Sequence, residues 1–257
     1  MNILVCLKQV PKNTFVKFDE NNNLIREGLP SHINPDDAKA LEMALCLKDA
    51  CGANITVITM GLPQSQSILQ DSIDKGADQG YVITDRAFGG ADTLATSYTI
   101  SSAIKSIGTF DIIFCGYKTS DGNTGQVGPQ ISEQLHLPLV SHVQSLKLSG
   151  EKLVLERGAG KYLETVSCAM PIVITVSDMA PKLRTDKAEV PDKKITMLTC
   201  ADFEVDINKT GKKGSATVVS STFQPKAPRK GTVINEKTAK LSVDKLFYML
   251  TENKLIG

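Results

Sequence analysis

The chain carries almost no net charge and contains no long apolar run. Its 29 lysine and arginine residues balance 28 aspartate and glutamate residues, giving a formal charge of +1, whereas a nucleic-acid-binding protein usually needs a strongly basic face. The longest apolar runs, such as Asp111–Cys115 and Pro171–Val176, are far too short to cross a bilayer. Residues 1–8 read as a strand and lack the parts of a signal peptide. These absences predict a cytoplasmic protein that handles a small molecule or a protein partner.

The motifs of metal sites and of common hydrolases are also absent. The six cysteines include no C-x-x-C pair and the three histidines show no metal-ligand spacing, although zinc and iron–sulfur sites need closely spaced ligands. The sequence has neither G-x-S-x-G nor H-E-x-x-H. We therefore predict no metal site and assign no catalytic side chain from the sequence.

The first half of the chain alternates apolar runs with helical patterns, in a composition ordinary for a globular protein. Such alternation is typical of an α/β fold, here a Rossmann-like, mainly parallel sheet with helices on both faces. Asn34 is the predicted N-cap of the first helix, with Pro35 at its first position. The predicted strands are Ile3–Lys8, Asn54–Met60, Gln79–Thr84 and Asp111–Cys115, and the predicted helices are Pro35–Cys51, Pro63–Lys75, Ala91–Ile107 and Gln126–Leu135.

The rest of the chain departs from this alternation. Between Pro11 and Ser31, the runs Val16–Phe18 and Leu24–Ile25 suggest a small hairpin. After Pro138, four strands without helix-length spacers predict antiparallel additions to the sheet. The residues from 179 on are rich in Lys, Pro and Thr, so we predict an α/β domain over 1–178 and an extended interaction arm over 179–257. The predicted later elements are strands Leu139–Leu148, Lys152–Arg157, Tyr162–Ala169 and Ile172–Ser177, and a C-terminal helix Leu241–Leu250 with Ser242 as its plausible cap.

Two segments following predicted strands are candidates for a ligand site, because parallel sheets bind ligands beyond the carboxyl ends of their strands. The glycine-rich segment Cys115–Pro129 opens a helix and suits a phosphate, although it is not the dinucleotide fingerprint. In Thr84–Thr96, Arg86 could pair with a phosphate or an anionic ring, and Asp92 or Thr93 could cap the following helix. Phe88 could cover a planar group or simply belong to the core. The residues alone indicate a nucleotide-binding α/β subunit of an assembly.

The sequence resembles the β subunit of electron-transfer flavoproteins over nearly its whole length. The most specific motif is Asp-Gly-x-Thr-x-Gln-Val-Gly-Pro at Asp121–Pro129. Family β subunits pair with a larger α subunit that carries its own FAD. The other matching stretches, in order along the chain, are Ile3–Pro11, Ile33–Asp37, Val57–Gly61, Asp85–Thr93 and Arg157–Glu164.

The resemblance also implies a ligand and a reaction. Respiratory members hold AMP in the β subunit, whereas the bifurcating type of anaerobes holds a second FAD that takes hydride from NADH. The stretches Arg26–Pro30, Ile33–Asp37 and Asp85–Thr96 are similar to the bifurcating type. They imply that one electron passes to ferredoxin or flavodoxin and the other, through the α-subunit flavin, to a partner flavin dehydrogenase, or that the flow is reversed to reduce NAD. A respiratory-type carrier with structural AMP and a non-redox nucleotide-binding regulatory module remain the alternatives.

Individual residues are assigned roles only through this resemblance. It implies an adenosine pocket, a ribose and phosphate site, and a stretch along the pyrophosphate, ribityl chain and isoalloxazine. Two departures from the family pattern, Lys118–Ser120 and Met179–Arg184, point to a different adenine contact and to a lactate (2-hydroxyacid) rather than an acyl-CoA dehydrogenase partner. The implied residues are, in the same order, Cys6, Asn34 and Met60; Asp121, Gly122, Thr124, Gly125, Gln126 and Val127; and Arg86, Ala87, Phe88, Asp92, Thr93 and Thr96.

Overall fold

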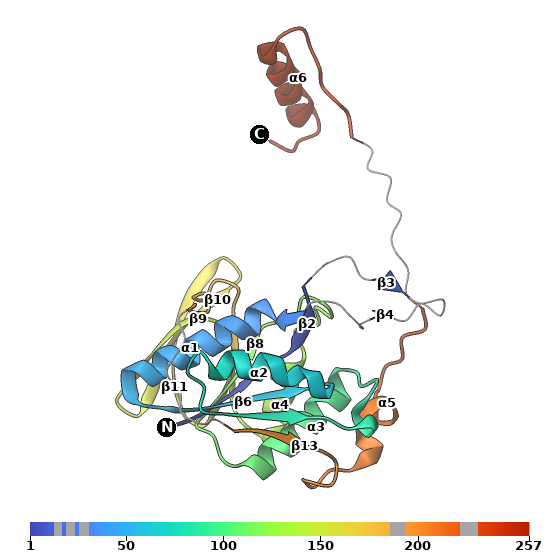
Figure 1. Ribbon diagram of the computed structural model, residues 1–257. Helices are drawn as coiled ribbons and strands as arrows, with labels where there is room; N and C mark the ends of the chain where they lie inside the picture. Colours follow the sequence, from blue (N-terminus) through green and yellow to red (C-terminus); the bar gives the residue numbers. More distant parts are fainter. Residues whose placement is uncertain (13–16, 19–23, 26–30, 186–193, 222–230, 257) are drawn as a thin grey trace. The chain divides into compact units, whose positions relative to one another are not determined.

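The computed structural model describes residues 1–12, 17–18, 24–25, 31–185, 194–221 and 231–256 (Figure 1). Internal contacts divide the chain into two units, Met1–Ser220 and Ser221–Gly257. The stretch 26–30, which contributes to the resemblance, and Val16 of the expected hairpin lie outside the described residues. No helix in the described part of the chain has both the length and the apolar composition needed to span a membrane.

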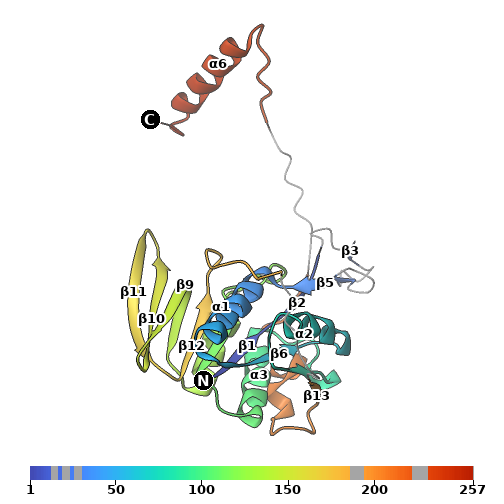
Figure 2. The same cartoon turned by 60° about the vertical axis from the view of Figure 1, so that its left-hand side comes forward.

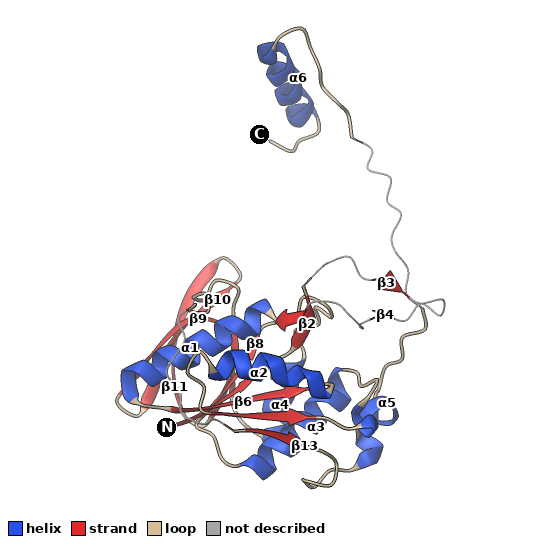
Figure 3. Ribbon diagram, in the orientation of Figure 1, coloured by secondary structure: helices blue, strands red, loops and turns tan. Residues whose placement is uncertain are grey.

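The first unit is built on one nine-stranded sheet (Figure 3). Its strand order is β11-β10-β9-β12-β8-β1-β6-β7-β13. Two short antiparallel pairs, β2 with β5 and β3 with β4, stand apart from it, and the second is the hairpin predicted between Pro11 and Ser31. The strands are β1 Asn2–Cys6, β2 Gln9–Pro11, β3 Lys17–Phe18, β4 Leu24–Ile25, β5 Ser31–Ile33, β6 Asn54–Met60, β7 Gln79–Ile83, β8 Ile112–Gly116, β9 Leu139–Ser149, β10 Lys152–Ala159, β11 Tyr162–Ala169, β12 Ile172–Val176 and β13 Ile195–Leu198.

Helices cover the two faces of this sheet, as the alternating pattern predicts. Side chains of α1 and α2 join one buried apolar cluster and those of α3 and α4 join a second cluster on the opposite face. The second unit contains one helix, α6, in its described residues. The helices are α1 Pro35–Cys51, α2 Gln66–Ile73, α3 Thr93–Ile107, α4 Val127–Leu135, the short α5 Gly211–Gly214 and α6 Ala239–Glu252, with single 3₁₀ turns η1 Pro63–Ser65, η2 Arg86–Phe88 and η3 Ile207–Lys209.

The central strands are apolar because both of their faces are covered. Along β1, Ile3 and Val5 enter the cluster beneath α1, whereas Leu4 and Cys6 enter the cluster beneath α3 and α4. Successive side chains of a strand point to opposite faces, so a strand between two helix layers needs apolar residues at every position. This requirement explains why these strands are recognisable as continuous apolar runs.

Three expectations for the later elements need correction. The antiparallel pairing of β9, β10 and β11 is confirmed (Figure 2). The fourth predicted strand, β12, instead runs parallel to both of its neighbours, β8 and β9. All five of its residues are buried, which suits a central position in the parallel sheet. The predicted helix Pro63–Lys75 consists of η1 followed by the shorter α2. Helix α6 begins before Ser242, and Thr238 is its cap, accepting a hydrogen bond from the N–H of Leu241.

The domain boundary also lies later than the predicted 178/179. Strand β13 pairs in parallel with β7 and so adds residues 195–198 to the edge of the sheet. Phe203 is buried in the same apolar cluster as α3. Residues up to Ser220 therefore belong to the first unit, and only the segment from Ser221 on forms the second.

Candidate functional site

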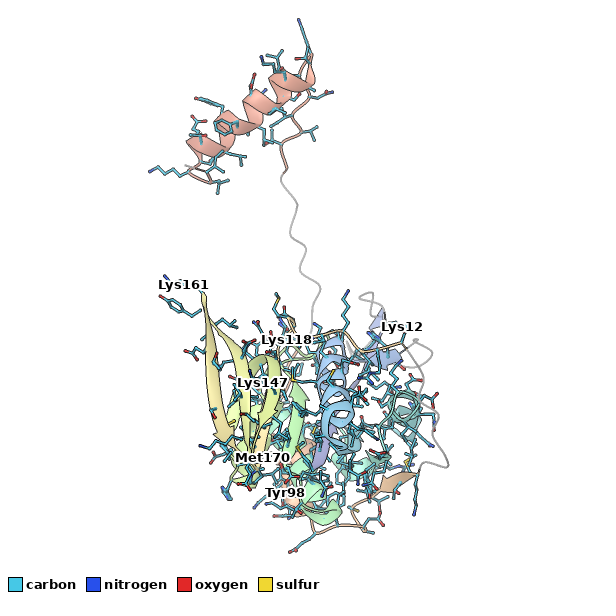
Figure 4. All side chains as sticks on the ribbon, turned by 90° about the vertical axis from the view of Figure 1, so that its left-hand side faces the viewer. Lys12, Tyr98, Lys118, Lys147, Lys161 and Met170 are labelled. Atoms are coloured by element: carbon cyan, nitrogen blue, oxygen red, sulfur yellow. The ribbon has the colours of Figure 1, made fainter. Side chains whose placement is uncertain are left out.

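The order of the strands makes the edge between β1 and β8 the candidate ligand site. From β1 the chain adds β6 and then β7 on one side, and it then crosses to place β8 on the other side of β1. Such a reversal opens a crevice beyond the carboxyl ends of the two central strands, where open α/β sheets bind ligands. Figure 4 shows Lys12 and Lys118 at this end of the sheet and Met170 at the opposite end. The chain segments that meet here follow β1, β6, β7 and β8.

Asn34 joins the start of α1 to the glycine-rich segment across this crevice. It occupies the N-cap position that the sequence predicts and is followed by Pro35, but its side chain makes no capping hydrogen bond. Its Nδ2 instead donates to the carbonyl of Lys118 at 2.8 Å, and its Oδ1 accepts from the N–H of Ser120 at 3.0 Å. The side chain of Asn34 therefore fixes the first turn of the loop after β8, which lies 84 to 86 residues further along the chain.

Asp37, in the first turn of α1, holds the ends of both central strands. One carboxylate oxygen accepts from the N–H of Lys8 at 2.8 Å and the other from the N–H of Gly116 at 3.1 Å. The residue is only 5% exposed, and burial raises the pKa of its carboxyl to about 7 despite hydrogen bonds from Asn34, Lys8 and Gly116 that lower it. A side chain at Gly116 would collide with Asp37. In the sequence, Asp37 is singled out only as the last residue of Ile33–Asp37, one of the stretches that carry the family resemblance.

The raised pKa of Asp37 makes a prediction about stability. The folded chain keeps this proton over the range from about pH 4 to pH 7 in which the unfolded chain, with a pKa of 3.8, has lost it. The contribution of Asp37 to the free energy of unfolding should therefore fall as the pH rises through this window, by at most about 1.4 kcal/mol per pH unit.

Chemical denaturation of the wild type and Asp37→Asn at several pH values measures this effect. We expect the difference in free energy of unfolding, wild type minus variant, to decrease steadily between pH 4.5 and pH 7.5. Asp71→Asn is the control, since it removes an exposed carboxylate from α2; Asp36→Asn is unsuitable because the charge of Asp36 helps to raise the pKa of Asp37. Parallel profiles for the wild type and Asp37→Asn would contradict the role of Asp37.

An ion pair ties the glycine-rich loop to Lys8, two residues beyond the end of β1. The ammonium of Lys8 lies 2.8 Å from both carboxylate oxygens of Asp121. Burial alone would raise the pKa of Asp121, but the hydrogen bond and charge of Lys8 outweigh it and hold this pKa below its usual value. Asp121 also accepts from the N–H of Gly122. Residues 122–124 are exposed, and Gly125 has a φ of +65°, which only glycine adopts readily.

The N-termini of α3 and α4 meet beside this loop. The hydroxyl of Thr93 donates to Oε1 of Gln126 at 2.8 Å, which links the first residue of α3 to the residue before α4. No side chain caps α4 in the described residues, so the N–H groups of Val127 and Gly128 have no capping partner, and Pro129 has no N–H. Oε1 of Gln130 is buried without a hydrogen-bond partner. Two helix N-termini and an unsatisfied acceptor suit the phosphates and hydroxyls of a nucleotide.

The second candidate segment, Asp85–Asp92, contains η2 and precedes α3. Arg86 is exposed. The ring of Phe88 is 4% exposed and lies 6.0 Å from the ring of Phe203, so the core interpretation is confirmed and the ring is not free to cover a planar ligand. Asp92 caps α3 by accepting from the N–H of Ala95 at 3.0 Å, as its position predicts. A ligand contact by Phe88 stays a prediction.

The remaining implied residues lie at the same edge of the sheet. Cys6 and Met60 end the neighbouring strands β1 and β6, and Cys6 is the register partner of Cys115 on β8. The backbone of Ala87 is engaged, since its N–H donates to Asp85 and its carbonyl accepts from Thr210. Thr96 is half-buried in the first turn of α3, and Thr124 is exposed. Their ligand contacts stay predictions.

An aromatic pair beside the loop has no counterpart in the sequence analysis. The rings of Tyr117 and His142 are in contact, with centroids 4.1 Å apart and a tilt of 44° between their planes, and a Cβ on Gly125 would lie 3.5 Å from the ring of Tyr117. His142 has a φ of +60° and lies where the register between β9 and β12 shifts. Bulges of this kind re-aim a side chain and occur next to functional sites. A single histidine within a strand pattern gives no local signal for this contact.

Comparisons with known proteins identify the family. A model of the electron transfer flavoprotein domain matches residues 22–199. The chain is 42% identical over 239 residues to an electron transfer flavoprotein subunit beta of Thermoanaerobacterium thermosaccharolyticum, covering 91% of this chain and 92% of the relative. It is 37% identical, over the full length of both chains, to the caffeyl-CoA reductase-Etf complex subunit CarD of Acetobacterium woodii and to the acryloyl-CoA reductase electron transfer subunit gamma of Anaerotignum propionicum. The chain belongs to the electron transfer flavoprotein family, among its β subunits.

Proposed function

We propose that this β subunit binds FAD at the crevice between β1 and β8, exchanges hydride with NAD(H), and divides or joins electron flow between ferredoxin or flavodoxin and a partner flavin dehydrogenase. The observation that carries the proposal is the junction of Asp121–Val127 with Asp85–Thr93, through the hydrogen bond between Thr93 and Gln126. Two loops joined in this way offer one phosphate-binding turn and one neighbouring stretch with an exposed cation. This arrangement supports a ligand longer than a mononucleotide.

The residues present fit such a ligand. Gly125 allows a close approach of the backbone, and the N–H groups of Val127 and Gly128 lack a capping side chain. The buried Oε1 of Gln130 needs a donor, which a ribose or ribityl hydroxyl would supply. When bound, FAD supplies the hydride and single-electron chemistry. The chain's own contribution is to hold the phosphates at α4 and to place Arg86 where its charge favours a reduced, anionic ring.

Release and quantification of the ligands distinguishes this proposal from its two alternatives. The complex with the α subunit, purified without added nucleotide, is denatured and its FAD and AMP are counted per αβ pair. Two FAD and no AMP support the proposal, because the α subunit accounts for one. One FAD with one AMP favours a respiratory-type carrier, and the absence of any nucleotide from the β subunit, or the presence of ATP there, favours a regulatory module.

Arg86→Ala should slow the reduction of the β-subunit flavin by NADH about tenfold or more, since a loss of ~1.4 kcal/mol in charge stabilisation gives that factor. Stopped-flow absorbance of the complex measures the rate. Lys147→Ala is the control, because Lys147 is an exposed cation on β9. Reduction at the wild-type rate in Arg86→Ala would return this arginine to the role of an ordinary surface charge.

The partner dehydrogenase is proposed within two classes. The departure at Met179–Arg184 favours a lactate (2-hydroxyacid) dehydrogenase, whereas the names of two relatives contain reductases of CoA esters and so favour an acyl-CoA type. The relatives match this chain over its whole length, so we give the acyl-CoA type greater weight than the sequence alone does. Electron transfer from the NADH-reduced complex to an added dehydrogenase of each class tests the choice, because only the true partner accepts electrons at a catalytic rate.

A further inference from the structure

Residues 199–217, here named the clasp, wrap around the segment Asp85–Asp92, here named the cofactor loop. At the start of the clasp, the N–H of Cys200 donates to the carboxylate of Asp85 at 3.2 Å, and the ring of Phe203 packs against Phe88. Further on, the N–H of Lys212 donates to the carbonyl of Gly89 at 3.0 Å. The clasp therefore contacts the cofactor loop along most of its length.

Asp92 connects the end of the clasp to the end of the cofactor loop. One carboxylate oxygen caps α3 through Ala95, and the other accepts from both the N–H of Thr217 at 2.9 Å and its hydroxyl at 3.0 Å. The N–H of Asp92 donates to the hydroxyl of Ser215 at 2.8 Å. Burial acts to raise the pKa of Asp92, but these donors outweigh it and keep the pKa below its usual value. Both oxygens of this carboxylate are thus committed to the protein.

The clasp also needs glycine at its closest approach. Gly211 has a φ of +53°, and a Cβ there would collide with the carbonyl oxygen of Ala87. Thr210, one residue earlier, is 1% exposed and its hydroxyl donates to that same carbonyl at 3.4 Å. Backbone lies directly against backbone at this point, so the position of the clasp and the shape of η2 depend on each other.

We propose that the clasp is a positioning element for the ligand held by the cofactor loop, and that the contact between Thr217 and Asp92 closes it. The inference rests on the proposed function for the identity of that ligand. A short loop with two adjacent exposed glycines, Gly89 and Gly90, samples many conformations unless other groups hold it. The clasp binds the carbonyls of Ala87 and Gly89 in the cofactor loop and the carboxylates at its two ends, Asp85 and Asp92. The side chain of Arg86 stays exposed and available to a ligand. Binding therefore does not have to order the loop.

The test measures ligand release from the full-length complex with the α subunit. Thr217→Val removes the hydroxyl and keeps the N–H, and we expect release of the β-subunit nucleotide after dilution to become about fivefold faster, in line with one net hydrogen bond of ~1 kcal/mol. Thr217→Ser keeps both donors and should restore the wild-type rate. Thr109→Val, at an exposed position near the amino ends of the strands, is the matched control. Thermal unfolding followed by circular dichroism shows whether the variants remain equally folded.

A second variant, Gly211→Ala, should release the nucleotide faster still, because the added Cβ pushes the clasp off the loop. Release is scored on whichever nucleotide the extraction finds, FAD or AMP, so the clasp is tested even if the assignment of FAD fails. Unchanged release in Thr217→Val, while Gly125→Val loses the nucleotide, would overturn the positioning role of the clasp. The proposed function would remain supported by the loss in Gly125→Val. Rescue by Thr217→Ser at an unchanged unfolding temperature would support a positioning role.

Discussion

Truncation after Gly231 is expected to yield a folded subunit that no longer copurifies with the α subunit. None of the residues of α6 is buried, although Val243, Leu246 and Phe247 form one apolar face together with Leu250. An amphipathic helix with this spacing suits a groove on another chain. Losing such anchors from an interface costs several kcal/mol, and ~3 kcal/mol weakens binding about a hundredfold. Size-exclusion chromatography and circular dichroism of the coexpressed subunits measure both properties.

A pair of neighbouring aromatic residues provides a sharper form of this experiment. Phe247 and Tyr248 are both 64% exposed, but successive helical positions point about 100° apart, so only Phe247 lies on the apolar face. Phe247→Ala should weaken the complex markedly and Tyr248→Ala much less. A folded truncation that still copurifies would refute the role of α6 in binding the α subunit. A truncation that unfolds or aggregates would indicate instead that the helix packs on its own sheet.

Gly125→Val is expected to abolish retention of the β-subunit nucleotide. The φ of +65° at this position is unfavourable for any β-branched residue, so the loop must change shape, and the added side chain blocks the backbone from a phosphate. Thr124→Val, by comparison, should weaken binding only severalfold, through the loss of one hydrogen bond of ~1 kcal/mol. Nucleotide content of the purified complex, measured by absorbance after denaturation, decides the outcome.

Gly150 supplies the matched control for strain. It lies between β9 and β10 with a φ of +60°, and a Cβ there would meet nothing within 4 Å. Gly150→Val therefore carries a similar backbone penalty at a position remote in sequence from both candidate loops. Full nucleotide occupancy in both variants would show that Asp121–Pro129 does not hold the phosphates, whereas loss in both would indicate a general effect on folding.

The central fold is predictable from sequence because its physical requirements are local. Strands β1, β6 and β8 are covered on both faces, so each shows as a largely apolar run, interrupted in β6 by the buried Thr56 and Thr59. The pairing of β12 is not local, since the short connection from β11 is compatible with a hairpin and its parallel position depends on β8 and β9. Strand β13 has only one largely buried residue, Leu198, at the edge of the sheet, so its four residues do not stand out from a polar stretch.

The candidate site divides in the same way. The cap at Asp92 can be read from sequence because its partner, Ala95, is three residues away. The roles of Asn34 and Asp37 cannot be read in this way, since the loop groups that they bind lie 79 to 86 residues along the chain. The resemblance to a family identifies the loops that carry the site, but it does not indicate which side chains hold those loops in place.

The clasp also sets the order in which the site can mature during synthesis. Thr217 follows Asp92 by 125 residues, so the strands, helices and glycine-rich loop have all been synthesised before the cofactor loop can be fixed. Chains fold from the N-terminal end as they are made, and contacts of long sequence separation form late. We therefore expect the nascent subunit to pass through a stage with an assembled sheet and an unfinished cofactor loop. We therefore expect nucleotide loading at the proposed site to follow translation of the first unit.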